Sequence, residues 1–517
     1  MTKVIKFIKQ NLLLLILGFT TLWLRLVNLG YSDYQGDEIK ALFLPEEGQS
    51  IYTFFLTQRK GPMQFIITFL LKLVDPNYIN RFFMRLPFAV AGILAVFFFY
   101  KLINLYFDKK IAFFSAFFLA TNGFFVAFSR IIQYQSYVIF FMVLALYFFS
   151  LAFKNEKWKL KGIYLGFLAW SFSMLSHYDG VFIAPFVLYT LYRWIKTYEI
   201  KSVKEFLKYF AIPVLITAIL LLSFYIPFVM ELSKSTLSYW KGRIEGTGGK
   251  ISSSKYLFTV YQPIYVIHIY TGLVVLGGVR TLIRIFQNFK KKNYERLFLY
   301  VGLGAWFVIA IAFMEFFVNI PGTHVYTYLI SLFIFLGMGV KFIWEILNKY
   351  LSKITFSGFL FWLGTFIVFG FIFAQSHQIF VEHGTEYPWK NEQFLIWTLP
   401  KPTPIYHLSI FGFPYYRHWD EIGDFVTSSE NNGWYSTNER KSIARYHVPF
   451  DKDTEEAGHF IYINNPQSFT NEIIYEKAKY WADNYPSVLS FFKNGDPSVK
   501  VYYMPKGSLK EIKEQGY

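Results

Sequence analysis

The sequence predicts a helical bundle that crosses a membrane several times and ends in a soluble α/β domain. Three observations predict this fold class. Hydrophobic residues make up 54% and charged residues only 16% of the 517 residues. Apolar runs of about 20 residues, each able to cross ~30 Å of hydrocarbon as a helix, recur from Leu12 to about Ala374. The Lys and Arg residues behind the net charge of +17 fall mostly in short segments between these runs, where they indicate membrane orientation rather than nucleic-acid binding.

The apolar runs, taken in order, predict about eleven transmembrane helices. The first covers about 11–28, and the lysines before it favour a cytoplasmic N-terminus, without a cleavable signal peptide. The others lie at about 82–100, 111–128 and 137–153, then as a pair that meets near 176–181, one ending near 230, one ending near 290, a pair that meets near 318–326, and one ending near 375. We therefore expect a multi-pass protein of the plasma or inner membrane.

The first outer segment, residues 29–61, is too polar to span. The apolar stretch 62–74 that follows it has only about 13 residues, which is short for a span. It is predicted to form a juxtamembrane or re-entrant helix on the outer side, with Pro62 at its first helical position. If it spanned instead, the later basic clusters would face outward, against the usual charge asymmetry.

The composition changes near residue 378, where long apolar runs stop. This change predicts a transmembrane domain at 1–377 and an extracytoplasmic α/β domain at 378–517. The patterns within it predict strands at Ile405–Phe411, Phe460–Ile463 and Val499–Tyr503, and helices around Trp419–Val426 and Tyr475–Tyr485. The chain has no cysteine, which excludes disulfides and thiolate metal sites.

Polar motifs with chemical potential fall in the predicted outer segments. Gly36-Asp37-Glu38 is either a helix start, with Asp37 as its cap, or an acidic site. Arg59-Lys60-Gly61-Pro62 either places cations at the membrane interface or binds a lipid phosphate beside a helix N-terminus. The arginine of Arg85-Leu86-Pro87 is expected to face protein or water, either tying helices together or serving a site.

Further polar residues lie in the later outer loops. Arg130 is a candidate phosphate ligand or a structural partner of Asp37 or Glu38. His177 and His324 are either interfacial polar residues or functional groups, and a metal site would need histidines and carboxylates to converge in space. The sequence therefore assigns no metal site and leaves a divalent-metal requirement open. The substrate-binding candidates are Tyr134, Gln135, His177, Asp179, Arg243, His324 and Tyr326.

In order and spacing, these motifs resemble those of the membrane glycosyltransferases with the GT-C fold. The similarity is to the branch containing protein O-mannosyltransferases and the lipid A aminoarabinose transferase. It rests on Gly36-Asp37-Glu38, Lys60-Gly61-Pro62, Arg85-Leu86-Pro87 and Ser129-Arg130. Gly61 stands where proline is commoner in that branch. The resemblance covers about 11–326 and weakens beyond the sixth helix, and the C-terminal domain does not match those of the characterised members.

This resemblance implies a hexosyl- or pentosyltransferase of the membrane. Its donor would be a sugar on polyprenyl phosphate, and its acceptor a hydroxyl of a protein, lipid or cell-envelope glycan outside the cytoplasm, with inversion. Asp37 would act as base, with Glu38 orienting it or holding the acceptor. Lys60 and Arg130 would bind the donor phosphate, with Arg85 as a weaker candidate. A phosphate leaving group needs no strong general acid, so these few acidic and basic residues would be enough for the reaction.

The sequence is also compatible with other functions. The main alternative is a transporter or flippase of a lipid-linked or small polar substrate. The sequence lacks an evident inverted repeat or a matched pair of broken helices, and its motif charges lie at one face rather than at mid-depth. A membrane scaffold that presents the C-terminal domain would not need the acidic and basic motifs. Transfer of a whole oligosaccharide is poorly distinguished from transfer of one sugar, and the sequence does not identify the sugar or the acceptor.

Overall fold

The computed structural model describes most of the chain. The described ranges are 2–245, 267–350, 356–384 and 412–505 without 431–433, 453–457, 467–479 and 481–482, together with a few isolated residues such as 386 and 393–394. These residues form two compact units. The bundle unit comprises 1–27, 43–77 and 85–380, and the terminal unit comprises 28–42, 78–84 and 381–517.

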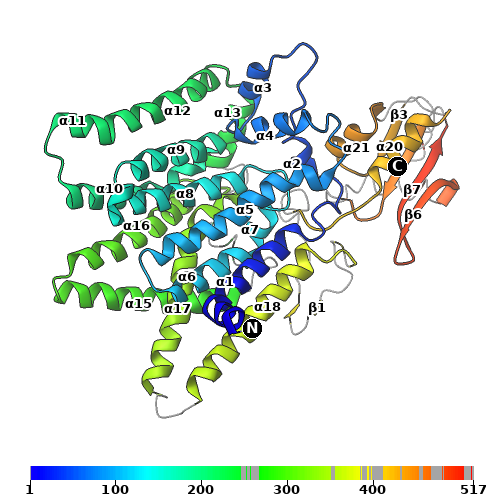
Figure 1. Cartoon of the computed structure of the whole chain (residues 1–517). Helices are drawn as coiled ribbons and strands as arrows, with labels where there is room; N and C mark the ends of the chain where they lie inside the picture. Colours follow the sequence, from blue (N-terminus) through cyan, green and yellow to red (C-terminus); the bar gives the residue numbers. More distant parts are fainter. Residues whose placement is uncertain are drawn as a thin grey trace. The chain divides into compact units, whose positions relative to one another are not determined.

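The bundle unit is a set of helices that pack side by side (Figure 1). Its longer helices are α1 (Thr2–Leu26), α5 (Arg81–Asn104), α6 (Lys109–Thr121), α8 (Gln135–Lys154), α9 (Lys161–Ser176), α10 (Ala184–Tyr198), α12 (Ile212–Met230), α13 (Lys234–Glu245), α15 (Ile267–Lys290), α16 (Tyr294–Phe316), α17 (Tyr326–Tyr350) and α18 (Ser357–Phe380). The shorter ones are α3 (Ile51–Thr57), α4 (Met63–Lys72), α7 (Gly123–Phe128), α11 (Val203–Phe206), the π-helical η3 (Leu207–Ala211), and the 3₁₀ turns η1 (Glu156–Trp158), η2 (Tyr178–Ile183) and η6 (Gly322–Val325).

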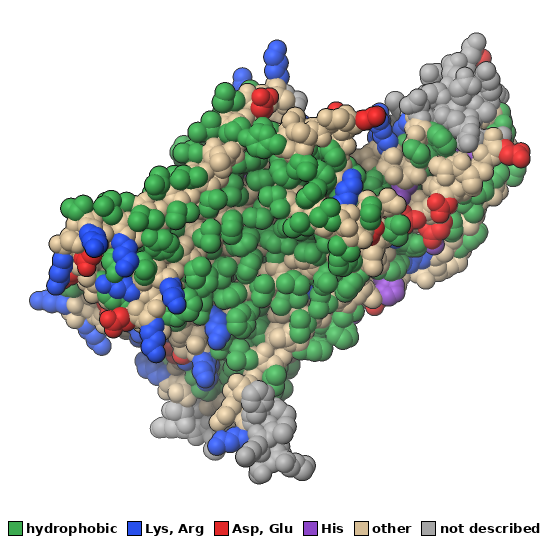
Figure 2. Space-filling model, turned by 45° about the horizontal axis from the view of Figure 1, so that its top comes forward, with side chains coloured by type: hydrophobic (Ala, Val, Ile, Leu, Met, Phe, Trp, Pro, Cys, Tyr) green, Lys and Arg blue, Asp and Glu red, His purple; other side chains and the backbone are tan. Residues whose placement is uncertain are grey.

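Seven of the described helices are long and apolar enough to cross a membrane. They are Arg81–Asn104, Gln135–Lys154, Val203–Met230, His268–Lys290, Tyr294–Phe316, Gly322–Tyr350 and Ser357–Phe380. Hydrophobic side chains cover much of the visible face of this unit (Figure 2). The other predicted spans correspond to α1, whose described apolar part is Gln10–Leu26, to α6 with α7, to α9 and to α10, and these are not among the seven. The predicted membrane-protein class is therefore confirmed, whereas the count of eleven spans stays a prediction.

Two predicted helices differ in detail from the structure. The stretch 111–128 is not one helix, because the chain turns at Asn122 between α6 and α7. The extended backbone of Asn122 ends α6, and its side chain accepts a hydrogen bond from the Phe124 N–H to start α7. The juxtamembrane helix predicted at 62–74 is α4, which begins at Met63 with Pro62 as its N-cap rather than its first residue.

Glycines set how closely α15 and α17 approach. A Cβ atom on Gly277 of α15 would lie 1.9 Å from the carbonyl oxygen of Phe335 in α17. In the other direction, a Cβ atom on Gly339 would lie 2.2 Å from the carbonyl oxygen of Leu273. Small residues on both helices therefore permit backbone contact, as is common where helices pack within a membrane.

The terminal unit contains a five-stranded mixed sheet of order β4-β3-β5-β7-β6. Its strands are β3 (Trp434–Thr437), β4 (Asp451–Lys452), β5 (Gly458–Ile463), β6 (Ser487–Lys493) and β7 (Asp496–Met504). β3 pairs in parallel with β4 and β5, and β7 pairs antiparallel with β5 and β6. The unit also contains α20 (Trp419–Ser428), α21 (Lys441–His447) and the pair β1 (Gln393–Phe394) and β2 (Trp397–Thr398).

Part of the secondary structure predicted for the C-terminal region is present in this unit. The strands predicted at Phe460–Ile463 and Val499–Tyr503 are confirmed within β5 and β7, and the helix predicted around Trp419 is α20. The predicted strand Ile405–Phe411 lies outside the described residues, as does most of the predicted helix Tyr475–Tyr485.

The first outer segment belongs in part to the terminal unit, although it lies far from the C-terminus in sequence. The N–H of Asp33 donates to the carbonyl oxygen of Tyr415 at 3.0 Å, and its carboxylate accepts from the N–H of Arg417 at 2.6 Å. The same carboxylate lies 2.9 Å from the guanidinium of Arg81. Burial raises the pKa of Asp33, while Arg81 and the Arg417 N–H act in the opposite direction. These bonds fix the segment that carries the acidic motif to the C-terminal region.

Candidate functional site

The acidic motif forms α2 (Gly36–Ile39), a single helical turn in the terminal unit. Gln35, rather than Asp37, is its N-cap. The Gln35 N–H donates to the Glu38 carboxylate at 3.0 Å, which makes one half of a capping box. Glu38 is fully buried, whereas the Asp37 side chain is 38% exposed and lies 3.6 Å from the ammonium of Lys40. Glu38 thus stabilises the turn, and Asp37 presents its carboxylate toward solvent.

The basic motif lies in the bundle unit, just before α4. The ammonium of Lys60 donates to the side-chain oxygen of Gln133 at 3.2 Å and lies 4.9 Å from the centre of the Tyr134 ring. Gly61 follows it in a tight contact, because a Cβ atom there would lie 1.9 Å from the carbonyl oxygen of Leu175. This close contact explains why position 61 is glycine, since no larger residue, proline included, fits against the end of α9.

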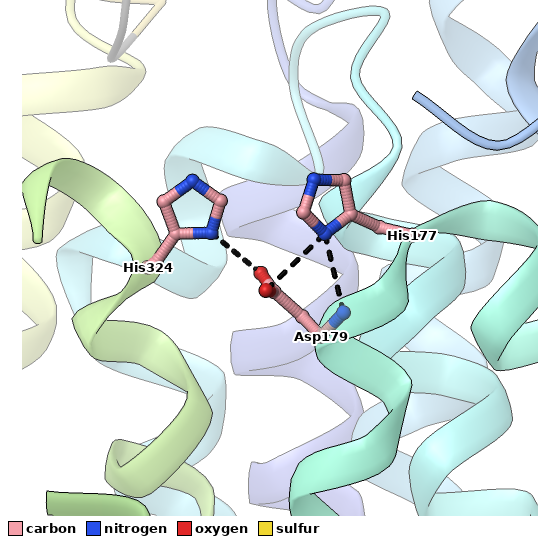
Figure 3. Close-up of side chains that lie close together, drawn as sticks. All are labelled: His177, Asp179 and His324. Atoms are coloured by element: carbon pink, nitrogen blue, oxygen red, sulfur yellow. Dashed lines mark hydrogen bonds and ion pairs between the residues drawn. The ribbon is translucent and has the colours of Figure 1, made fainter. Parts of the chain in front are cut away.

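Three polar side chains of the bundle unit, those of His177, Asp179 and His324, lie close together (Figure 3). The Asp179 carboxylate lies 3.2 Å from Nδ1 of His177 and 2.7 Å from Nδ1 of His324. It also accepts a hydrogen bond from the Tyr326 hydroxyl at 2.7 Å. His177 and Asp179 are buried, and His324 is half-buried.

Two interruptions between helices create this cluster. The helical pattern of α9 ends at Ser176, and His177 takes an extended backbone before the 3₁₀ turn η2. The His177 ring then caps η2, since its Nδ1 accepts from the Asp179 N–H at 3.2 Å. On the other side, η6 precedes α17 and carries His324. Both turns sit at helix ends, which lets their side chains meet.

Electrostatics within the cluster favours the charged form of the Asp179 carboxylate. Burial alone would raise the pKa of Asp179, but the two histidines more than offset this and hold it well below its ordinary value. Burial lowers the pKa of His177, although Asp179 opposes the shift. A carboxylate and neutral imidazoles are the protonation states in which these side chains bind metal ions.

Tyr134 connects this cluster to Lys60. Its ring stacks on the His177 ring with centroids 4.3 Å apart. Arg243 contributes a further positive charge that acts on Tyr134, and its guanidinium also donates to the carbonyl oxygen of Ile320 at 3.2 Å. Cations, aromatic rings and the His–Asp cluster therefore occupy one region of the bundle unit.

The predicted arginines form a second buried group. Arg130 donates from Nη1 to the carbonyl oxygen of Leu24, and Arg25 donates from Nη1 to that of Ala120, each at 3.0 Å. Both acceptors lie in the last turns of helices, where carbonyl groups lack helical partners. Burial, with smaller contributions from the charges of Arg85 and Arg25, lowers the pKa of Arg130 to about 9. The adjoining cavity, which Arg25 and Ser129 help to line, measures about 10 Å³, enough for one water.

The structure thus brings together many of the predicted site residues, and sequence reasoning missed others. Tyr134, His177, Asp179, His324 and Tyr326 are connected by direct contacts, with Lys60 and Arg243 beside them. Gln135 is buried, next to Tyr134 in the chain, while Asp37 and Glu38 belong to the other unit. No local pattern predicts that Arg25 packs near Arg130 or that Asp33 binds Arg81 and Arg417, because both contacts join segments far apart in the chain.

Comparisons with known proteins agree with the resemblance drawn from the motifs. The family model described as dolichyl-phosphate-mannose-protein mannosyltransferase matches residues 60–228. The crystal structure of ArnT from Cupriavidus metallidurans in the apo state is similar over 97% of this chain and 98% of that one, at 11% identity and a TM-score of 0.50. A comparison with curated protein sequences gives no match.

A second solved structure shares the fold over part of its length. The oligosaccharyltransferase of Archaeoglobus fulgidus, in complex with Zn and sulfate, matches 85% of this chain at 13% identity and a TM-score of 0.51. The present chain covers 62% of that enzyme. The predicted GT-C fold, a helical membrane bundle with a small C-terminal domain, is confirmed by these similarities.

Proposed function

We propose that this protein is a membrane glycosyltransferase that moves a sugar from polyprenyl phosphate to a hydroxyl acceptor on the extracytoplasmic side. The observation that carries the proposal is the mannosyltransferase family match, which begins at Lys60 and includes Arg85, Arg130, His177 and Asp179. The N-terminus would be cytoplasmic, residues 1–377 would form the transmembrane transferase domain, and 378–517 would form an extracytoplasmic domain. The acceptor would be a protein, lipid or cell-envelope glycan.

Asp37 is the proposed base. Its carboxylate is partly exposed, and an exposed ion pair such as the one with Lys40 contributes at most about 1 kcal/mol, so it leaves the carboxylate accessible. Glu38 is a positioning residue, because its bond to the Gln35 N–H holds the turn that carries Asp37. Attack by the activated acceptor hydroxyl on the anomeric carbon, opposite the departing phosphate, would invert that centre.

Lys60 is the proposed principal cation for the donor phosphate. It is half-buried, and its contacts with Gln133 and Tyr134 hold the ammonium next to the His–Asp cluster. Arg130 is the second candidate and Arg85 the third. Arg130 is buried and its guanidinium donates to the carbonyl oxygen of Leu24, so a contribution from this arginine requires a rearrangement.

Binding of the carrier lipid is the first test. Polyprenyl phosphate at about 100 times its dissociation constant should stabilise the purified protein by roughly 2.7 kcal/mol, while the chain-matched alcohol should not. The Lys60→Ala variant should lose this difference, and Lys290→Ala, which removes an exposed lysine elsewhere, should retain it. Equal effects of the two lipids on the wild-type protein would contradict a phosphate site.

Sugar transfer is the second test. Asp37→Asn should abolish transfer from a radiolabelled polyprenyl-phosphate sugar while lipid stabilisation remains. Asp424→Asn changes an exposed aspartate of α20 in the same way and should transfer normally. Near-normal transfer by Asp37→Asn would remove Asp37 as the base. Stabilisation by the phosphate lipid without any transfer, combined with lipid movement across vesicles, would favour the flippase alternative.

A further inference from the structure

The His177, Asp179 and His324 side chains meet the chemical requirements of a divalent metal site. Each offers one ligand atom, and these three atoms lie within 4.8 Å of one another. Two ligands of a tetrahedral ion with bonds of 2.0 to 2.1 Å are separated by roughly 3.4 Å. The carboxylate already lies within this spacing of both rings, at 3.2 and 2.7 Å. Displacements of the three ligand atoms on the order of 1 Å would bring them to the spacing of a tetrahedral site.

The hydrogen bonding of His177 gives an independent reason for a cation. Its Nδ1 accepts from the Asp179 N–H at 3.2 Å, yet the same atom lies 3.2 Å from the Asp179 carboxylate. One imidazole nitrogen is either a donor or an acceptor, so it cannot satisfy both neighbours. As the acceptor of that N–H it cannot donate a proton to the carboxylate, so the negative charge lacks a donor from this ring. A cation beside the carboxylate would supply the missing positive partner.

The surroundings provide the support that metal ligands require. The Tyr326 hydroxyl donates to the Asp179 carboxylate at 2.7 Å and fixes its orientation. Tyr134 stacks on His177 and limits rotation of that ring. His177 and Asp179 are buried, so water competes little for the ligand atoms.

We propose that His177, Asp179 and His324 bind one divalent ion of the zinc class, with Tyr326 orienting the carboxylate. Two imidazoles and one carboxylate are borderline ligands that suit Zn²⁺ and Co²⁺ better than Mg²⁺ or Ca²⁺. Three protein ligands leave a coordination position open to water or an anionic oxygen. The proposal concerns ion binding and does not rest on the transferase proposal.

Direct metal binding by the full-length chain tests this proposal. Purified protein in detergent is stripped with EDTA and titrated with Zn²⁺ against a chromophoric chelator, and with Co²⁺ by visible absorption. The wild-type protein should bind one ion. His177→Gln, Asp179→Asn and His324→Gln should each lose this binding, whereas His268→Gln, which changes an exposed histidine of α15, should keep it. Tyr326→Phe should bind on the order of 10- to 100-fold more weakly.

The controls keep each outcome decisive. Near-ultraviolet circular dichroism shows whether a variant has kept its packing, and Tyr326→Phe replaces any ligand variant that has not. A wild-type protein that binds no ion, or binding that survives in both His177→Gln and His324→Gln, overturns the proposal. Metal binding with no sugar transfer would refute only the transferase proposal, and transfer without metal binding would refute only the metal site.

Discussion

Replacing Gly61 by alanine tests whether the contact between the basic motif and the end of α9 positions the site. The new Cβ atom would lie 1.9 Å from the carbonyl oxygen of Leu175, and real contacts of this kind stay above 3.0 Å. The two backbones must therefore separate by roughly 1.1 Å, because a packed interior has no room to absorb the atom. Gly61 adjoins Lys60, and Leu175 lies two residues before His177, so the displacement reaches both parts of the site.

The expected magnitudes follow from this displacement. Overpacking of this kind costs about 1 to 3 kcal/mol of stability. A misplacement on the order of 1 Å lowers a reaction rate by about 100-fold, so transfer should fall by that factor while much of the fold survives. The assays are thermal unfolding in detergent, sugar transfer, and the Zn²⁺ titration, in which affinity should also fall because α9 leads into His177.

The control for this variant is Gly304→Ala in α16, where a Cβ atom meets nothing within 4 Å. That change should leave transfer and ion binding unaltered and should favour the helix slightly. If Gly61→Ala instead unfolds at the wild-type temperature and transfers at the wild-type rate, the close contact does not position the site, and the steric argument for glycine at this position is wrong.

Three further predictions concern other contacts. Arg417→Ala should destabilise the terminal unit by roughly 1.5 to 3 kcal/mol, since the buried Glu386 carboxylate loses its guanidinium partner and keeps only Lys493 as a cation; hydrogen exchange in that unit measures this, and unchanged protection would contradict it. Gly277→Ala should force α15 away from Phe335 and lower the thermal unfolding temperature, and an unshifted temperature would show that the helices separate at little cost. Lys60→Ala should weaken polyprenyl-phosphate binding at least tenfold, and unchanged affinity in a lipid titration would assign this lysine to the interface alone.

The sequence by itself determined the membrane-protein class, because apolar runs of helical length follow directly from composition and spacing. It also determined the small C-terminal α/β domain, whose strands around Phe460 and Val501 are rich in β-branched and aromatic residues. It selected His177, Asp179 and His324 one at a time as polar residues at the ends of predicted helices. Those assignments need only local patterns, because burial of an apolar run and the start of a helix depend on neighbours in the chain.

Only the tertiary structure decided which of these residues meet. His177 and His324 are separated by more than four helices in sequence order, and their common contact with Asp179 depends on how α9 and α17 pack. The same is true of Asp33, which reaches Arg417 through contacts that no local pattern encodes. The break at Asn122 arises from a side-chain cap that competes with helix continuation, a balance that hydropathy does not measure. Function at such a site comes from convergence in space, and convergence is a property of packing rather than of local sequence.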